Sequence, residues 1–129
     1  MSDLQTDVLI MGTGIAGLTT AMKLAEKGFS VTIVTRESRP EITNTMWAQG
    51  GIIFSGDEKI EREDLVKDIM KASAGTSYLA AAELLAHRSG EIVQEILLDK
   101  VHTPFAHGND GELLFTREAA HSRDRIIYN

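Results

Sequence analysis

Three glycines near the start of the chain have the spacing of a turn that binds phosphate groups. Gly12, Gly14 and Gly17 follow a short apolar run and precede a stretch that is compatible with a helix. The first permits a tight turn, the second lets the backbone approach a pyrophosphate, and the third lets the helix pack closely on the strand. The helix dipole and free N–H groups then favour phosphate. The alternative is a strand-to-helix turn without a ligand. The predicted contacts are Gly12, Thr13, Gly14, Ile15, Ala16 and Gly17.

Groups with acid and base chemistry occur near the other end of the chain. Glu118 and His121 lie within the stretch Thr116-Arg117-Glu118-Ala119-Ala120-His121-Ser122. Residue types alone leave two interpretations of His121, an active-site role and an ordinary packing or hydrogen-bonding role, because neutral histidine serves both. Taken alone, Glu118 is one acid among many, and Ser122 also suits the N-cap of a final helix.

The stretches around the glycines predict a compact βαβ unit. Residues 7–11 form a continuous apolar run typical of a buried parallel strand, and residues 15–27 carry apolar side chains at helical spacing. Gly28 is placed to end this helix, and the β-branched residues of 30–35 predict a second strand. The end of that strand is expected to lie beside the glycine turn.

The second strand ends where a dinucleotide-binding fold expects an acid for the ribose hydroxyls. This chain instead has Thr35 and Arg36 there, with Glu37 following. We expect Arg36 to pair with phosphate or cover the adenine, and Thr35 or Glu37 to take the ribose. A solvated Arg36–Glu37 pair is the alternative.

Composition narrows the class of protein. The 129 residues are 43% hydrophobic and 25% charged, which suits one small domain. A formal net charge of -6 gives no electrostatic reason to expect nucleic acid or an anionic membrane surface as a partner. No apolar run approaches the ~20 residues of a membrane span, and residues 1–6 lack a signal-peptide pattern, so we expect a cytoplasmic protein. With Cys 0, disulfides and cysteine-based metal sites are excluded.

The middle of the chain is predicted to be mostly helical. Helices are expected at 60–74, from Ser77 to 88, and from Ser89 to 99, followed by a short hairpin that turns at 108–111. An acidic patch precedes and enters the first of these helices. A solvated helix start explains the patch better than a metal site, because acids there suit the helix dipole. The patch comprises Asp57, Glu58, Glu61, Glu63 and Asp64.

A polar segment with two glycines follows the βαβ unit and carries a family resemblance. The stretch Asn44-Thr45-Met46-Trp47-Ala48-Gln49-Gly50-Gly51 resembles the Thr-x-x-Ala-Gln-Gly-Gly segment of the succinate dehydrogenase and fumarate reductase flavoprotein family. The resemblance implies that Asn44 to Gly51 lie along FAD. Respiratory members have a histidine before the threonine that bonds covalently to FAD. This chain has Asn44, so the resemblance implies non-covalent FAD. Without the resemblance, Gly50-Gly51 is simply a turn.

The stretch from Thr116 to Ser122 resembles the Thr-Arg-Glu-x-x-His-Ser signature of the L-aspartate oxidases within that family. The resemblance implies that Glu118 is the catalytic group that meets the substrate amine, and that His121 also belongs to the active site. Two positions depart from the family pattern. Ala119-Ala120 replaces two glycines, and Asp124 replaces a second basic residue.

Together these motifs predict an α/β fold: a Rossmann-like FAD-binding domain with an N-terminal βαβ unit, helices and a short hairpin. We expect residues 1–129 to be the N-terminal part of that domain, without the capping and C-terminal domains of the family. The resemblance implies FAD-dependent oxidation of L-aspartate to iminoaspartate, with oxygen or fumarate as acceptor, in de novo NAD biosynthesis, and quinolinate synthase as a candidate partner. The alternatives are a fumarate reductase or succinate dehydrogenase flavoprotein, and a non-catalytic nucleotide-binding module.

Overall fold

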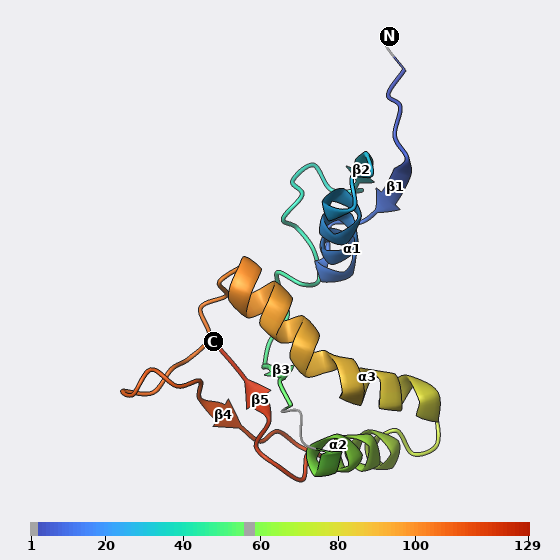
Figure 1. The fold of residues 1–129 in the computed structure, drawn as a ribbon. Helices are drawn as coiled ribbons and strands as arrows, with labels where there is room; N and C mark the ends of the chain where they lie inside the picture. Colours follow the sequence, from blue (N-terminus) through green and yellow to red (C-terminus); the bar gives the residue numbers. More distant parts are fainter. Residues whose placement is uncertain (1–2, 56–58) are drawn as a thin grey trace. The chain divides into compact units, whose positions relative to one another are not determined.

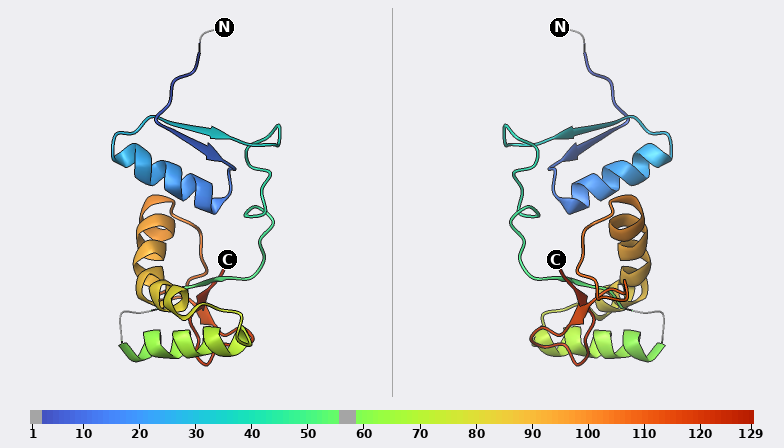
Figure 2. Two further views of the ribbon diagram at one scale, coloured as in Figure 1. Left: turned by 90° about the vertical axis from the view of Figure 1, so that its right-hand side faces the viewer. Right: turned by 90° about the vertical axis from the view of Figure 1, so that its left-hand side faces the viewer.

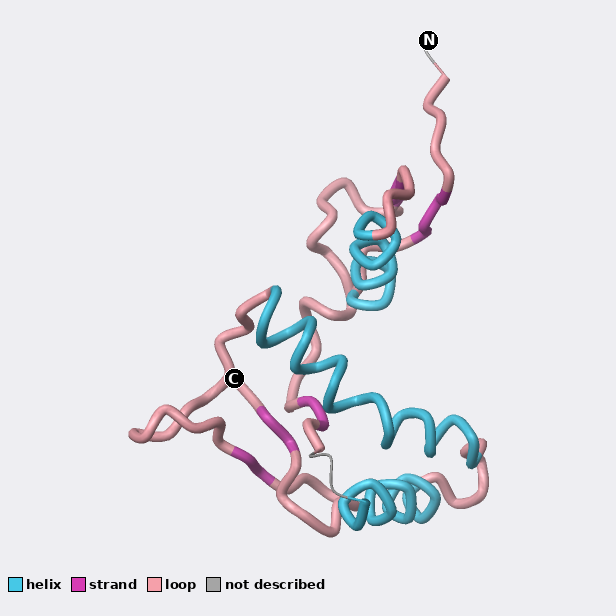
Figure 3. Tube along the Cα trace, in the orientation of Figure 1, coloured by secondary structure: helices cyan, strands magenta, loops and turns pink. Residues whose placement is uncertain are grey.

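The computed structural model describes residues 3–55 and 59–129. They divide into two compact units, Met1–Gln49 and Gly50–Asn129, and each unit is described by itself. Figure 3 distinguishes the helices, strands and loops of both. Within the described ranges, no helix combines the length and the hydropathy needed to cross a lipid bilayer.

The first unit is the predicted βαβ unit. Strand β1 (Val8–Met11) is followed by helix α1 (Ile15–Glu26) and strand β2 (Val31–Val34) (Figure 1). The strands are parallel and in register from Val8 opposite Val31 to Met11 opposite Val34. Gly28 has a φ of +84°, a conformation that glycine adopts without strain after a helix end. The α/β prediction is therefore confirmed.

The prediction that β1 is buried on both faces is wrong for this chain. Leu9 is 59% exposed and Met11 is 86% exposed. Ile10 faces α1, since a Cβ on Gly17 would stand 3.4 Å from its Cγ2. Successive side chains of a strand point to opposite faces, so Leu9 and Met11 point away from α1. Helix α1 therefore covers only one of the two faces of β1.

The second unit packs two helices and a small antiparallel sheet. Helix α2 (Lys59–Ala72) lies beside α3 (Leu79–Ile92), which continues as the π-helical segment η1 (Val93–Lys100) (Figures 1 and 2). The sheet has the order β3 (Ile52–Ile53), β5 (Ile126–Ile127), β4 (Phe115–Thr116). The buried apolar side chains of the second unit are Leu65, Ala82, Ala86, Val93, Ile96, Ile126 and Ile127.

The predicted helix break at Ser89 is wrong, because α3 runs through Ser89 and Gly90 without interruption. A Cβ on Gly90 would collide with the backbone carbonyl oxygen of Ser55. The glycine therefore lets the helix pack against this carbonyl, and it does not mark a helix end. Ser77 is not the N-cap either, since Tyr78 occupies that position without a side-chain capping bond.

The predicted final helix after Ser122 is also wrong, because residues 126–127 form the central strand of the small sheet. Ile126 lies opposite Ile53 and Thr116, and Ile127 lies opposite Ile52 and Phe115. Ile127 is 0% exposed. Pairing with two distant strands thus overrides the local helical pattern.

The hairpin turn at 108–111 is confirmed. The Gly108 N–H donates a hydrogen bond to the Glu112 carbonyl (2.9 Å), and His107 bridges to Leu113. Gly111 has a φ of +84°, which suits glycine at the end of the turn.

Candidate functional site

The glycine turn of the first unit connects β1 to α1 in the geometry that the sequence predicts. Gly12 has a φ of +107°, and its N–H donates to the Val34 carbonyl of β2 (2.7 Å). A Cβ on Gly17 would collide with the Gly12 carbonyl oxygen. Each of these glycines is therefore required by the backbone itself, Gly12 for the left-handed turn and Gly17 for the close approach of helix and strand.

The N-terminus of α1 is suited to an anion. Its N-cap is Gly14, which makes no side-chain capping bond, and its first turn contains no acidic residue. The positive end of the helix dipole is therefore not neutralised by the helix's own side chains. The second motif reaches this helix end through Thr45, whose Oγ1 accepts a hydrogen bond from the Ile15 N–H (3.1 Å).

An open cavity of about 760 Å³ lies over the glycine turn. Three segments that are separate in the sequence line it: the glycine turn, the end of β2, and the stretch from Ile42 to Trp47. The predicted cofactor residues that line it are Gly12, Thr13, Gly14, Arg36, Asn44, Thr45 and Trp47. Other predicted residues lie nearby in the chain without lining it, namely Ile15, Ala16 and Gly17 in α1, and the exposed Met46, Ala48 and Gln49.

The three candidate ribose residues all line this cavity at the end of β2. Arg36 and Glu37 form an ion pair (Nη2 to Oε1, 3.0 Å), with the Arg36 side chain 93% exposed and the Glu37 side chain 36% exposed. The Glu37 N–H donates to Thr35 Oγ1 (3.4 Å). The exposed Arg36 side chain and its ion pair with Glu37 match the alternative interpretation of a solvated pair. All three residues nevertheless line the cavity, so each remains a candidate for binding the ribose.

These features fit the dinucleotide part of FAD. The left-handed Gly12, the helix end that lacks acids, and a cavity lined by hydroxyl, amide and guanidinium groups match the needs of a pyrophosphate and its ribose. A group of that size fits within a cavity of this volume.

The remaining predicted cofactor residues, Gly50 and Gly51, lie in the second unit. Gly50 has a φ of +90°, and a Cβ on Gly51 would collide with the Ile127 carbonyl oxygen and with the Ile126 side chain. Both positions therefore require glycine. They turn the chain into β3 and bring backbone N–H groups to the surface of the small sheet.

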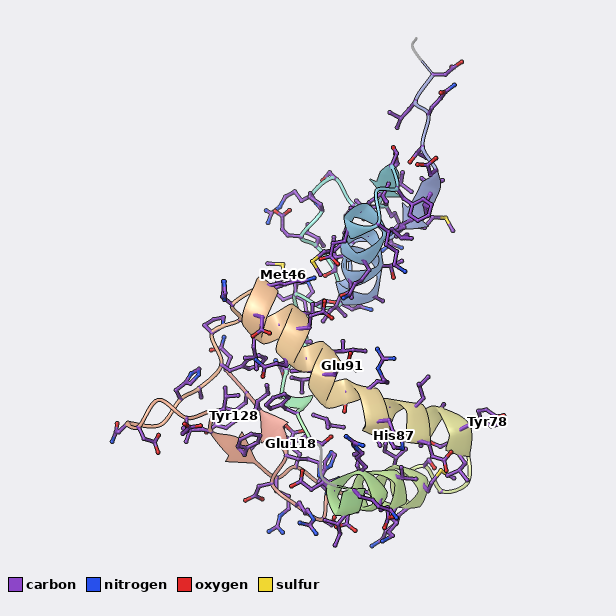
Figure 4. All side chains as sticks on the ribbon, viewed as in Figure 1. Met46, Tyr78, His87, Glu91, Glu118 and Tyr128 are labelled. Atoms are coloured by element: carbon purple, nitrogen blue, oxygen red, sulfur yellow. The ribbon has the colours of Figure 1, made fainter. Side chains whose placement is uncertain are left out.

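Glu118 lies on this glycine turn (Figure 4). Its Oε1 accepts a hydrogen bond from the Gly51 N–H (3.3 Å) and would stand 3.2 Å from a Cβ on Gly50. The structure thus brings together the predicted catalytic acid and the last part of the predicted flavin segment, 67 residues apart in the sequence. A side chain at Gly50 would compete with the carboxylate for this space.

His121 lies next to Glu118 in the same loop, and its N–H donates to the Glu118 carbonyl (3.2 Å). Its Nδ1 is buried and has no hydrogen-bond partner among the described residues. Such buried nitrogens are usually satisfied in folded proteins, and the described residues leave this one without a partner.

A polar cluster behind this loop was not predicted from the sequence. Asp68 of α2 accepts two hydrogen bonds on Oδ2 from Ser122, one from the N–H and one from Oγ (2.8 Å each). Arg125 Nη1 stands 3.2 Å from the same oxygen, with side-chain exposures of 4% for Arg125 and 12% for Asp68. No local pattern signals this cluster, since 54 residues separate Asp68 from Ser122.

The charge state of Asp68 follows from these contacts. Burial raises the pKa of its carboxyl, but hydrogen bonds from Ser122 and the charges of Arg125 and His121 outweigh burial, so that its pKa lies below the usual value. Asp68 is therefore ionised at neutral pH and balances the buried Arg125.

The acidic patch at the start of α2 is only partly described, since Asp57 and Glu58 lie outside the described residues. Glu63 pairs with Lys59 (3.7 Å) and Asp64 with Lys67 (3.4 Å) along the helix. Across the described ranges, no three His, Cys, Asp or Glu side chains gather in a way that would hold a metal ion. Glu63 has the contact of a solvated helix surface, whereas Asp64 is 22% exposed and also binds Arg123.

The departure from two glycines at Ala119-Ala120 has a visible cost. Ala120 has a φ of 73°, in the left-handed region that disfavours a Cβ. We expect Ala120→Gly to raise the free energy of unfolding by about 1 kcal/mol, because glycine adopts this conformation without strain. Ala119 lies outside the left-handed region, so Ala119→Gly is the matched control and should lower stability. Chemical unfolding of both variants checks the prediction; destabilisation by Ala120→Gly would contradict it.

Comparison with known proteins agrees with this description. Residues 7–129 match the family described as FAD binding domain. The chain is 39% identical over 125 residues to an L-aspartate oxidase of Halobacterium salinarum, and 32% identical over 122 residues to one of Streptomyces coelicolor. Each alignment covers 95% of this chain, but only 23% and 20% of the respective relative. The chain therefore spans less than a quarter of the length of these relatives.

Solved structures show the same fold. The Mycobacterium smegmatis Sdh1 complex in the apo form is similar with a TM-score of 0.84 and 25% identity, over 95% of this chain and 21% of that one. The Escherichia coli quinol fumarate reductase FrdA is similar with a TM-score of 0.84 and 19% identity, over 98% of this chain and 22% of that one. At this identity the second likeness concerns the fold alone.

Proposed function

The chain belongs to the FAD binding domain family, and from this premise we propose that it is the N-terminal part of an FAD-dependent L-aspartate oxidase. The proposed reaction converts L-aspartate to iminoaspartate, with oxygen or fumarate as electron acceptor. Residues outside this chain would supply the capping and C-terminal domains. The curated relatives that carry this name, and the Thr-Arg-Glu-x-x-His-Ser motif around Glu118, support the assignment.

The observation that carries the proposal is the Glu118 carboxylate on the Gly50-Gly51 turn. A carboxylate beside a segment proposed to contact the flavin would supply a negative partner for the amino group of an amino acid. An ammonium needs a negative partner and must lose a proton before the amine lone pair can assist oxidation. Succinate and fumarate have no ammonium for such a carboxylate to bind.

Each element of the chain has a separate task in the proposed mechanism. The glycine turn, the N-terminus of α1 and Thr45 would hold the pyrophosphate and orient the cofactor. When bound, FAD supplies the acceptor for the hydride that leaves the amino acid Cα. Glu118 would bind the ammonium through a charge-assisted hydrogen bond and accept its proton at a carboxylate oxygen. The Gly51 N–H holds that carboxylate in place.

A second proposal, a fumarate reductase or succinate dehydrogenase flavoprotein, is favoured by the shared Ala48-Gln49-Gly50-Gly51 segment and by the structural likeness. Asn44 and Glu118 favour the oxidase instead. A third, a non-catalytic nucleotide-binding module, is favoured by the Arg36–Glu37 pair at the expected acid position. The roles in NAD biosynthesis and with quinolinate synthase rest on the resemblance of the sequence motifs.

Acid precipitation of the FAD-loaded full-length protein tests the mode of cofactor attachment. Asn44 lines the cavity over the glycine turn and has no nucleophilic ring nitrogen to bond to a flavin carbon. We therefore expect all of the yellow colour to be released into the supernatant. Flavin that stays with the precipitate would contradict non-covalent binding. Protein that never takes up a flavin spectrum would contradict the FAD proposal itself.

A further inference from the structure

The loop that carries Glu118 and His121 is attached to α2 through two acids, Asp64 and Asp68, and Asp68 makes the more buried attachment. Oδ2 of Asp68 accepts two hydrogen bonds of 2.8 Å from Ser122, one from the N–H and one from the hydroxyl. Nη1 of Arg125 lies 3.2 Å from the same oxygen and forms an ion pair with it, without the geometry of a hydrogen bond. Ser122 is joined to Arg125 in turn, because Arg125 Nη2 donates to Ser122 Oγ (3.3 Å). Hydrogen bonds to an ionised and largely buried carboxylate are stronger than those between neutral groups.

The part of the loop that carries Glu118, residues 117–120, has fewer contacts to hold it in place. The side chains from Arg117 to Ala120 are exposed, and Ala120 adopts a left-handed conformation that disfavours alanine. The Glu118 carboxylate is held by one hydrogen bond of 3.3 Å from Gly51. The carbonyl of Glu118 accepts from the His121 N–H, which precedes the anchored Ser122 by one residue. Loss of the anchor would therefore free Glu118 as well.

From these contacts we infer that Asp68 is a positioning residue, which acts through Ser122 and Arg125 to keep the Glu118 carboxylate on the Gly50-Gly51 turn. It touches no reacting atom. The inference rests on the proposed function, because it takes Glu118 as the group that accepts the proton of the substrate ammonium. Misplacement of a catalytic group by about 1 Å costs on the order of 100-fold in rate, so a remote anchor can have a large kinetic effect.

Asp64 provides a matched control on the same helix. It lies one turn before Asp68 and binds Arg123 of the same loop, with Arg123 Nη2 and Nε each 2.8 Å from its Oδ2. Its contact partner is 44% exposed, and the pair reaches neither Ser122 nor Glu118. Asp64→Asn removes one charge and one loop contact but leaves the anchor of Ser122 intact.

The test compares Asp68→Asn and Asp64→Asn in the full-length protein by steady-state kinetics with L-aspartate. We expect Asp68→Asn to lower kcat at least ~10-fold, since the acid is misplaced in the bound complex, with FAD affinity within ~3-fold of the parent. Asp64→Asn should stay within ~3-fold in kcat. In a Glu118→Gln background, Asp68→Asn should have little further effect, because residues that act through one another are not additive.

A second measurement does not depend on catalysis. Amide hydrogen exchange of the full-length protein should show loss of protection at residues 118–122 in Asp68→Asn, and not in Asp64→Asn. Ser122→Ala keeps the Asp68–Arg125 pair and is the milder variant if Asp68→Asn does not fold. Ser122→Thr retains the hydroxyl and should recover part of the loss.

These measurements separate the inference from the proposed function. Equal kcat losses from Asp68→Asn in the parent and Glu118→Gln backgrounds would overturn the positioning role, as would unchanged amide protection at Ser122. The other outcome is that Asp68→Asn loses amide protection while the parent protein does not oxidise L-aspartate. That result would overturn the proposed function but would still support Asp68 as the anchor of the loop.

Discussion

Glu118→Gln is expected to slow flavin reduction by L-aspartate about 100-fold or more in the full-length protein. Glutamine keeps the shape of the side chain, and its Oε1 can still accept the hydrogen bond from the Gly51 N–H. The substitution removes the negative charge and the proton acceptor that the substrate ammonium requires. Loss of a general base typically costs about 100-fold to 10,000-fold. Stopped-flow reduction of the FAD-loaded protein under anaerobic conditions measures this step directly.

The reverse half-reaction provides the control within the same variant. Fumarate has no amine, so reoxidation of reduced flavin by fumarate should be affected much less. Equal losses in the two half-reactions would assign Glu118 a structural role on the glycine turn. Unchanged reduction by L-aspartate would overturn its assignment as the catalytic base.

Gly14→Val is expected to abolish FAD binding, a loss of at least about 100-fold in affinity or about 2.7 kcal/mol. A Cβ at Gly14 would stand 3.4 Å from Thr45 Oγ1, which is an ordinary contact. The two γ-methyl groups of valine would extend beyond this Cβ, into the space beside Thr45 or into the cavity over the turn. The pyrophosphate is proposed to occupy that part of the cavity.

Gly14→Ala is the matched control for this experiment. Gly14 has φ −72° and ψ 173°, which any residue adopts, so neither substitution should strain the backbone. Alanine should therefore keep the fold and bind FAD more weakly than the parent but more tightly than valine does. Fluorescence titration with FAD gives the three affinities. Parent-like affinity in Gly14→Val would mean that the phosphates bind elsewhere.

The first unit was predictable because its signals are local. Gly12 and Gly17 are required by backbone geometry within a few residues of the turn, and the parallel pairing follows from the helix that connects the two strands. The arrival of Thr45 at the N-terminus of α1 was implied only by the family resemblance. Neither spacing nor periodicity indicates a contact between residues 30 positions apart.

The second unit was less predictable because distant contacts decide it. The local sequence around Ile126 and Ile127 favours a helix, but pairing with β3 and β4 makes these residues a strand. Ser89 has the residue type of a helix start, but α3 continues through it, and Gly90 lets the helix pack against the Ser55 carbonyl. Asp68 and Ser122 are polar residues of the kind usually found on the surface, and they belong to different parts of the chain. No pattern in the sequence indicates that they pair. Tertiary packing overrides local preference at each of these places.

Anaerobic titration of the FAD-loaded full-length protein with L-aspartate and, separately, with succinate is the most direct test of the proposed function. The two dicarboxylates differ by the amine that Glu118 is proposed to bind. The proposal predicts that L-aspartate bleaches the flavin absorption at stoichiometric concentrations and that succinate leaves it oxidised. Bleaching by succinate with no response to L-aspartate would contradict the proposed function and assign the chain to a succinate dehydrogenase or fumarate reductase flavoprotein.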